Sequence, residues 1–218
     1  FVGVSIGKIK TEYGLPEGPS SEPAAGEYIK LNQQRLALAS EYRPQQSNWQ
    51  NLNFDLAYTD YDHAEFEEDE AGTEFLSKAW ELRSSATYEL PASWRGIFGY
   101  HAILRDYQAL GDETFTPNTD TDSHALFMLH EKRFGPVKLE FGSRFERLTH
   151  QAYELTDDNG SRDLQQQFNL FSWSVGAVYQ LQSEQQLTLA FSQAASALAQ
   201  QVAIRNAQEP KTSRVIVQ

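Results

Sequence analysis

The sequence contains no cysteine, so neither a disulfide framework nor a thiolate metal site can form in it. No apolar run reaches the roughly 18 residues that a membrane-spanning helix needs. Positive charge is also scarce, because 18 basic residues stand against 30 acidic ones and the net charge is -12. Such a chain repels phosphate backbones, which excludes nucleic acid as a partner. These absences still allow a membrane protein built from strands, whose apolar signal is weak in any one segment.

Hydrophobic alternation at period two is what the sequence does contain. In segment 49–60, Leu52, Phe54 and Leu56 fall on one face of an extended chain and Asn53 falls on the other. Several alternating segments run for about 12 residues, against about 5–6 in soluble proteins and about 9–11 in tilted membrane-spanning strands. The phase is ambiguous in one of them, 124–133. The candidate strands are 1–9, 28–42, 49–60, 74–90, 94–106, 124–133, 137–148, 167–181 and 186–193.

The connections between these segments alternate strictly in length. The short ones are 43–48, 91–93, 135–136 and 182–185, and the long, polar and acidic ones are 10–26, 61–73, 107–123 and 149–166. A closed membrane sheet has this arrangement, with tight turns on one side and long loops on the other. Aromatic residues cluster beside the short turns, as in the girdle at a membrane interface. They are Tyr42, Trp49, Tyr88, Trp94, Phe134 and Tyr179.

We therefore expect an all-β fold, a section of an antiparallel transmembrane β-barrel in the bacterial outer membrane, in contact with outer-membrane lipid. The polar faces support this, because charges such as Lys138, Glu140 and Arg144 on one strand are costly against lipid but acceptable toward a wet interior. The alternative is a soluble β-sandwich with decorated loops, in which the same aromatics form the core. Residues 1–194 are expected to be barrel strands and loops, and 195–218 an irregular or helical tail rich in alanine and glutamine.

One segment concentrates the residues that bind metal ions. Between Asp60 and Glu74 the chain holds eight carboxylates and one histidine. Asp62, His63 and Glu65 are close enough in sequence to share a divalent cation, and imidazole with carboxylate suits zinc. The alternative is a solvated acidic loop that raises the local cation concentration without binding one tightly.

Other candidate chemistry is weaker. The acidic segment 106–124, with Asp120, Asp122 and His124, lacks the glycine and the terminal glutamate of a calcium-binding EF-hand loop, so we interpret it as a solvated turn. The isolated His101, His130 and His150 are interpreted as lumen or interface residues; no Gly-x-Ser-x-Gly, phosphate-loop or dinucleotide motif occurs, and we expect no catalytic residues, no enzyme and no resident cofactor.

Several segments resemble TonB-dependent outer-membrane receptors, specifically the zinc-uptake (ZnuD-like) subgroup. The most specific match is the stretch Tyr58-Thr59-Asp60-Tyr61-Asp62-His63-Ala64-Glu65. The other matching segments are 3–7, 13–16, 35–42, 72–75, 125–127, 139–146 and 187–194. Two places depart from the subgroup: the segment 10–26 contains no histidine, and Ala195-Ser196-Ala197 stands where Arg-Ala-Pro is usual.

The resemblance implies a barrel of about 22 strands around an N-terminal plug, with energy for import passed from the TonB-ExbB-ExbD complex through that plug. It also implies that the transported ligand is zinc or a similar metal or metal complex. We expect this chain to be the central barrel section, with the plug and the other strands outside it. The alternative function is a complete small barrel with a structural or adhesive role.

Overall fold

A computed structural model describes residues 1–14, 27–45, 47–67, 70–111, 116–157, 160–182 and 184–196. These residues form nine strands. They are β1 (Val2–Gly14), β2 (Tyr28–Tyr42), β3 (Trp49–Glu67), β4 (Glu70–Leu90), β5 (Trp94–Leu110), β6 (Thr119–Phe134), β7 (Val137–Asp157), β8 (Gly160–Gln182) and β9 (Gln185–Gln193).

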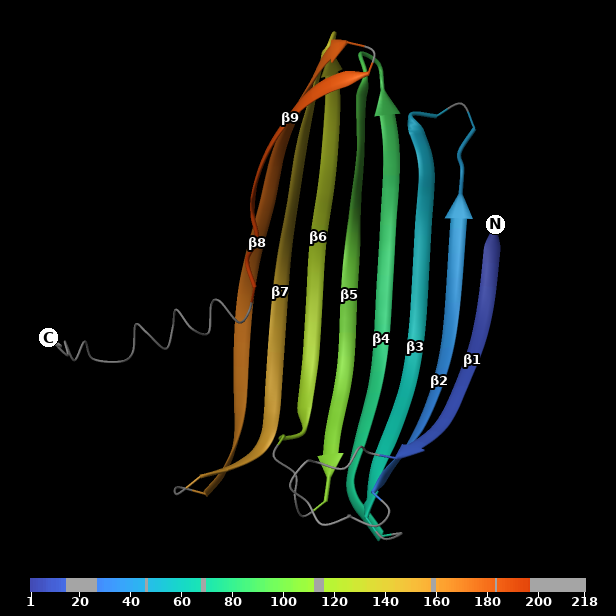
Figure 1. Ribbon diagram of the computed structural model, residues 1–218, viewed down its shortest axis with the longest axis vertical. Coiled ribbons are helices and arrows are strands. Elements are labelled where there is room, and N and C mark those ends of the chain that lie inside the picture. Colours follow the sequence, from blue (N-terminus) through green and yellow to red (C-terminus); the bar gives the residue numbers. More distant parts are fainter. Residues whose placement is uncertain are drawn as a thin grey trace, which may run out of the picture.

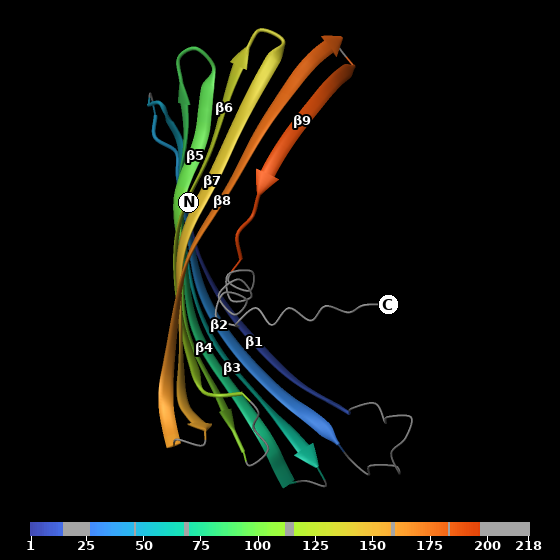
Figure 2. The same ribbon diagram turned by 90° about the vertical axis from the view of Figure 1, so that its left-hand side faces the viewer.

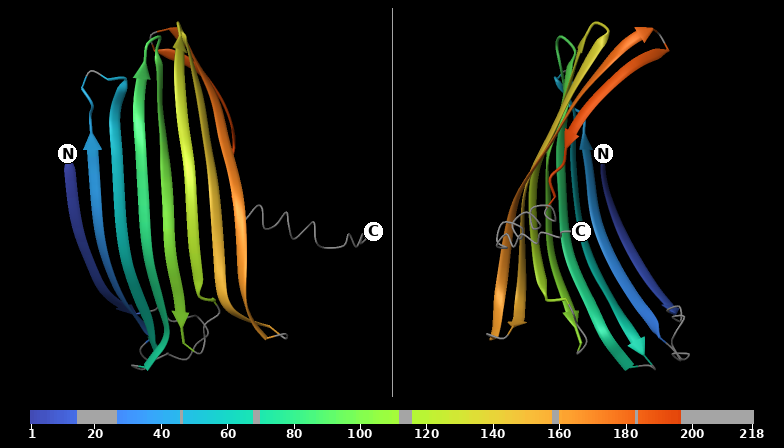
Figure 3. Two further views of the ribbon diagram at one scale, coloured as in Figure 1. Left: turned by 180° about the vertical axis from the view of Figure 1, so that it is seen from behind. Right: turned by 60° about the vertical axis from the view of Figure 1, so that its left-hand side comes forward.

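All nine strands belong to one antiparallel sheet in which the spatial order follows the chain order, from β1 to β9 (Figure 1). Seen from the side, the sheet is a single, strongly twisted layer (Figure 2). Figure 3 shows the same layer from behind and obliquely, with β1 at one edge and β9 at the other. The soluble β-sandwich considered above needs two packed sheets, and the described part of the chain contains one. The expectation of an all-β antiparallel sheet is confirmed.

The part of the chain that the structure describes holds no helix both long and apolar enough to cross a membrane.

The strand ends beside the short turns lie at one end of the sheet, here called the turn end, and the opposite strand ends are here called the loop end (Figure 1). At the turn end the strands begin and end close to where the sequence predicts. For example, β3 begins at Trp49 and β4 ends at Leu90. Toward the loop end they run further than expected. β7 continues to Asp157, and β3 continues to Glu67, so most of the expected loops 61–73 and 149–166 are strand instead.

The strands are longer than the sequence predicts because apolar alternation and strand pairing have different causes. Alternation arises where one face of a strand meets lipid and the other meets a polar interior. Beyond the membrane both faces are wet, and the alternation fades while backbone pairing continues. Asp60, Asp62 and His63 are paired to β2 and β4 in unbroken register, although their sequence is polar on both faces.

One face of the sheet, here called the outer face, carries an apolar belt. Side chains that pair across strands share a face, and Leu56 pairs with both Leu38 and Leu82. The belt side chains include Leu36, Leu38, Leu52, Phe54, Leu56, Tyr58, Trp80, Leu82, Phe98, Leu104, Leu126, Phe141, Phe145, Phe171, Val175, Leu187, Leu189 and Phe191. On each central strand the belt spans about 9–11 residues, which is the length a tilted strand needs to cross a bilayer.

The belt is not covered by any other part of the described chain. Leu126 is 63% exposed, Phe171 54% and Leu189 59%. So much uncovered apolar surface is stable only against lipid or a partner. The outer face is therefore the lipid-facing wall.

The belt crosses the strand ladder obliquely. Its border toward the loop end lies between Tyr58 and Asp60 on β3, but between Phe171 and Asn169 on β8. Along the cross-strand row that contains Tyr58, β8 contributes the polar Gln167. A membrane border that steps along the register is expected when strands tilt by about 35–45° to the barrel axis.

Aromatic side chains mark both borders of the belt. At the turn end Trp49 packs edge-on against Tyr88 and Phe98, with ring centroids 6.1 and 5.6 Å apart. The expected girdle beside the short turns lies on the outer face. Lys132 places its ammonium 4.4 Å from the Trp94 ring centroid, which suits a cation at the headgroup level.

The opposite face, here called the inner face, is polar and carries ion pairs at mid-height. Arg144 contacts Glu146 at 3.1 Å, and Glu146 also accepts a 2.6 Å hydrogen bond from Ser123. Nearer the turn end Lys138 lies 2.6 Å from Glu140. Charges that would be costly in lipid are therefore placed on the wall that faces the interior.

The tail expected over 195–218 begins with Ala195 and Ser196, which belong to no strand, and its remainder lies outside the described residues.

Candidate functional site

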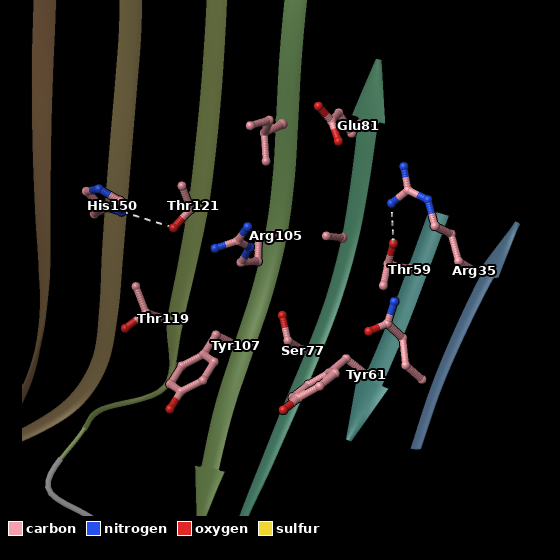
Figure 4. Close-up of a pocket in the computed structure, with 13 residues that line it drawn as sticks. Arg35, Thr59, Tyr61, Ser77, Glu81, Arg105, Tyr107, Thr119, Thr121 and His150 are labelled. Carbon is pink, nitrogen blue, oxygen red and sulfur yellow. Dashed lines mark hydrogen bonds between the residues drawn. The ribbon is translucent and has the colours of Figure 1, made fainter. Parts of the chain in front are cut away.

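A hollow of about 570 Å³ lies on the inner face, across β2 to β7 and toward the loop end (Figure 4). Ser77 and Ala79 of β4 are the small side chains in its middle. Larger side chains from the strands on either side surround them. The hollow is level with the loop-end border of the belt, because Arg105 stands between Leu104 and Asp106 of the outer face.

A single cross-strand row supplies the chemistry of this hollow. The row contains Arg35 of β2, Thr59 of β3, Ala79 of β4, Arg105 of β5, Thr121 of β6 and His150 of β7. Figure 4 shows the labelled side chains on one side of the strands. Arg35 Nη1 donates a 2.9 Å hydrogen bond to Thr59 Oγ1, and Thr121 Oγ1 lies 3.0 Å from His150 Nδ1. Hydroxyls of Tyr61, Tyr107 and Thr119 line the hollow on its loop-end side.

The carboxylate in the hollow is already paired. Glu81 lies 3.1 Å from Nε2 of His101, and this contact stands toward the turn end. Within the described residues neither Arg35 nor Arg105 forms an ion pair. Among the residues that the structure describes, the two guanidinium groups of the hollow therefore have no carboxylate partner.

The structure separates the three predicted metal ligands by face. Asp62 lies on the outer face, where its Oδ2 accepts a 2.7 Å hydrogen bond from Asn32 Nδ2. His63 and Glu65 pair with Leu31 and Ile29 and lie on the inner face. Adjacent residues of an extended strand point to opposite faces, so the sheet brings His63 and Glu65 to one side and Asp62 to the other.

His63 sits at the loop-end margin of the hollow among aromatic rings. Its ring centroid is 4.5 Å from that of Phe75 in a stacked geometry and 5.5 Å from that of Tyr61. Its Nδ1 is buried and has no hydrogen-bond partner in the described chain. A buried imidazole nitrogen without a partner is uncommon, and it can accept a hydrogen bond or bind a metal ion.

No three histidine, aspartate or glutamate side chains of the described residues lie close enough together to hold one metal ion. The histidines interpreted above as lumen or interface residues have other neighbours. His101 and His150 face the interior, and His130 hydrogen-bonds Tyr88 on the outer face near the turn end.

The acidic segment 106–124 is largely strand and does not form one turn, since β5 runs to Leu110 and β6 starts at Thr119. Asp122 contacts His124 at 2.8 Å on the outer face. Beyond the belt, Tyr153 donates a 2.6 Å hydrogen bond to Asp120. That bond to a carboxylate raises the pKa of the Tyr153 phenol above its ordinary value, because losing the proton would break it. These acids are used within the sheet.

The sequence alone does not predict this hollow as a site. Its residues come from six strands, and the register alone assembles them. Each arginine does carry a local signal, since it stands on the polar face beside the last belt residue of its strand toward the loop end, Leu36 or Leu104.

Comparison with protein families matches residues 7–210 to the family described as TonB dependent receptor-like, beta-barrel. No curated protein matches the chain. The family match covers nearly the whole chain and agrees with the long antiparallel strands, the lipid-facing belt and the polar inner face. The chain belongs to the TonB-dependent receptor-like β-barrel family.

Proposed function

We propose that this chain forms part of the wall of an outer-membrane receptor that takes up zinc or a similar metal or metal complex. The family consists of bacterial outer-membrane receptors that transport substrates together with TonB and is not an enzyme family. The turn end of the sheet is then periplasmic and the loop end extracellular.

The placement of His63 is the observation that carries the metal assignment. Its unpartnered Nδ1 and the carboxylate of Glu65 stand on the inner face, at the extracellular margin of the hollow. Imidazole nitrogen and carboxylate oxygen are a donor pair that zinc accepts. A zinc ion entering the barrel from outside would meet this pair before the hollow.

The acidity of the extracellular margin acts in the same direction. The chain carries a net charge of -12, and a dense run of acids lies at and beside the end of β3. A rim of one sign of charge raises the local concentration of oppositely charged ions and speeds their capture. This effect would concentrate divalent cations at the mouth even before specific binding.

The test measures zinc binding to the purified full receptor in detergent by isothermal titration calorimetry. The double variant His63→Ala, Glu65→Ala should bind zinc at least about tenfold more weakly, as expected when metal-site groups are lost. The control is His124→Ala with Asp122→Asn, which removes an imidazole and a carboxylate charge from the outer face. Unchanged zinc affinity in the first double variant would overturn the assignment of these residues.

Transport is tested separately from binding. Cells that depend on this receptor for growth under zinc limitation should grow more slowly with the first double variant and normally with the control. Equal growth of cells with and without the receptor, at zinc concentrations that limit growth, would count against zinc uptake altogether.

A further inference from the structure

The inner-face hollow has a charge opposite to that of the chain around it. Acidic residues outnumber basic ones by 30 to 18 in the sequence, yet Arg35 and Arg105 line this hollow with no ion pair in the described residues. The carboxylate beside them, Glu81, contacts His101. A guanidinium offers five N–H donors in a fixed fork that fits carboxylate and phosphate oxygens. The donors of Arg105, and those of Arg35 not used by Thr59, are free for such a ligand.

The rest of the lining fits the same type of ligand. Ser77 and Ala79 leave space between the arginines, which come from β2 and β5, three strands apart. Neighbouring strands are about 4.8 Å apart, so the two backbones are separated by roughly 14 Å, and long side chains reaching inward from both can share one small ligand. Hydroxyls of Thr59, Thr121 and Tyr107 can donate further hydrogen bonds to anionic oxygens.

We propose that this hollow binds a small multivalent anion of the carboxylate or phosphate class, and that a metal reaches it as a complex of that anion. The second half of this proposal rests on the proposed function of metal uptake, and the first half does not. A bare divalent cation is disfavoured in the hollow, because two positive guanidinium groups repel it. An anionic complex reverses the sign of that interaction. His63 and Glu65 lie at the margin, where they can meet the metal while the arginines hold its anionic ligand.

Two anion sources share this chemistry, and the experiment separates them. The full receptor in detergent is titrated in a calorimeter with citrate, inorganic phosphate, zinc chloride and zinc citrate in separate experiments. We expect citrate or phosphate to bind without metal. The variant Arg35→Gln, Arg105→Gln should weaken that binding by at least about tenfold, because each charge-assisted hydrogen bond to an anion is strong.

The matched control is Arg147→Gln. Arg147 lies on the outer face, where its Nη2 donates a 2.8 Å hydrogen bond to Gln167. The Arg147→Gln variant removes an arginine charge from the opposite face of the sheet and should leave anion binding unchanged. The variant Arg105→Lys keeps the charge but loses the fork, and we expect it to bind the anion with intermediate affinity.

Each outcome decides one of the two proposals. Absence of citrate and phosphate binding at millimolar concentration would overturn the anion site, and so would equal binding by the double arginine variant. Zinc chloride binding that survives in that variant, without any anion binding, would keep metal uptake and reject the anion site. Anion binding that depends on the arginines, with no effect of zinc on affinity or growth, would keep the anion site and reject zinc uptake.

Discussion

Tyr58 and Asp60 stand two residues apart on the outer face of β3, and the border of the apolar belt passes between them. The Tyr58 ring packs against Trp80 of the next strand at a centroid distance of 4.8 Å. Asp60 pairs across the ladder with Lys78, so the outer faces of β3 and β4 change from aromatic to charged side chains at the same level. This step fixes the height at which the sheet leaves the lipid.

A charge placed inside the belt should destabilise the barrel far more than the same charge on the inner face. We expect Phe54→Arg to lower the free energy of unfolding of the full receptor by about 2–4 kcal/mol, the cost of arginine near the bilayer midplane. Phe54 is 39% exposed on the outer face and lies between the Trp49 and Asp60 borders. Urea unfolding from lipid vesicles measures the difference.

Asn53→Arg is the matched control, because Asn53 precedes Phe54 and pairs with Ser85 on the inner face. It should change the free energy of unfolding by less than about 1 kcal/mol. Equal destabilisation by the two variants would contradict the assignment of Phe54 to the lipid and Asn53 to the interior.

Gly99 of β5 is a position where the inner face has no room for a side chain. A Cβ there would lie 2.5 Å from the Ser84 carbonyl oxygen and would also meet the Phe127 ring, which crosses the glycine. We expect Gly99→Ala to destabilise the barrel by about 1–3 kcal/mol, the usual effect of overpacking. Thermal unfolding followed by heat-modifiable gel migration gives the comparison.

The control for this prediction is Gly7→Ala on β1, where a Cβ would meet nothing within 4 Å. Alanine has less backbone freedom than glycine in the unfolded chain, so this variant should be neutral or slightly stabilising. A loss at Gly7 as large as that at Gly99 would show that glycine is needed in these strands for another reason than space.

The turn ends of the strands could be predicted from the sequence, and the loop ends could not. At the turn end, apolar alternation stops at a Gly, Pro or polar cluster, as after Phe134 and before Val137. At the loop end the strand continues into water, where neither face needs apolar residues. The continuation of β7 from Leu148 to Asp157 therefore has no hydrophobic signature.

The candidate site was predictable to a similar extent. His63 and Glu65 stood out because the chain concentrates acids around a histidine. Asp62 is grouped with them because the sequence predicts a loop over 61–73, whereas in a strand the same three residues divide between two faces. Arg35 and Arg105 lie in the same cross-strand row only because of the register of β2 to β5, which a single sequence does not reveal.

The turn between β4 and β5 contains two residues with strained backbone. Ala92 and Ser93 have φ values of 64° and 60°, a region that non-glycine residues occupy at a cost of roughly 1 kcal/mol. We expect Ser93→Gly to be neutral or to stabilise the barrel by up to about 1 kcal/mol in urea unfolding. Glycine relieves the strain but is freer in the unfolded chain, so the two effects partly cancel.

The turn between β6 and β7 gives the reverse comparison. Gly135 has a φ of 57° and already occupies this region without a Cβ. Gly135→Ala should destabilise the barrel by about 1 kcal/mol, although a Cβ there would meet nothing within 4 Å, because the backbone and not the space is limiting. An unchanged urea midpoint for Gly135→Ala would contradict the left-handed conformation of this turn.

The hydrogen bond between Asn32 and Asp62 offers a way to decide whether Asp62 takes part in metal binding. Its length of 2.7 Å and its carboxylate acceptor make it a strong contact between β2 and β3. A double-mutant cycle with Asn32→Ala and Asp62→Ala should give a coupling energy of about 1 kcal/mol in favour of the pair. Because Asp62 points away from His63, adding zinc should leave that coupling unchanged. If zinc abolishes the coupling, Asp62 leaves Asn32 to bind the metal, and β3 must rearrange at its extracellular end when the receptor is loaded.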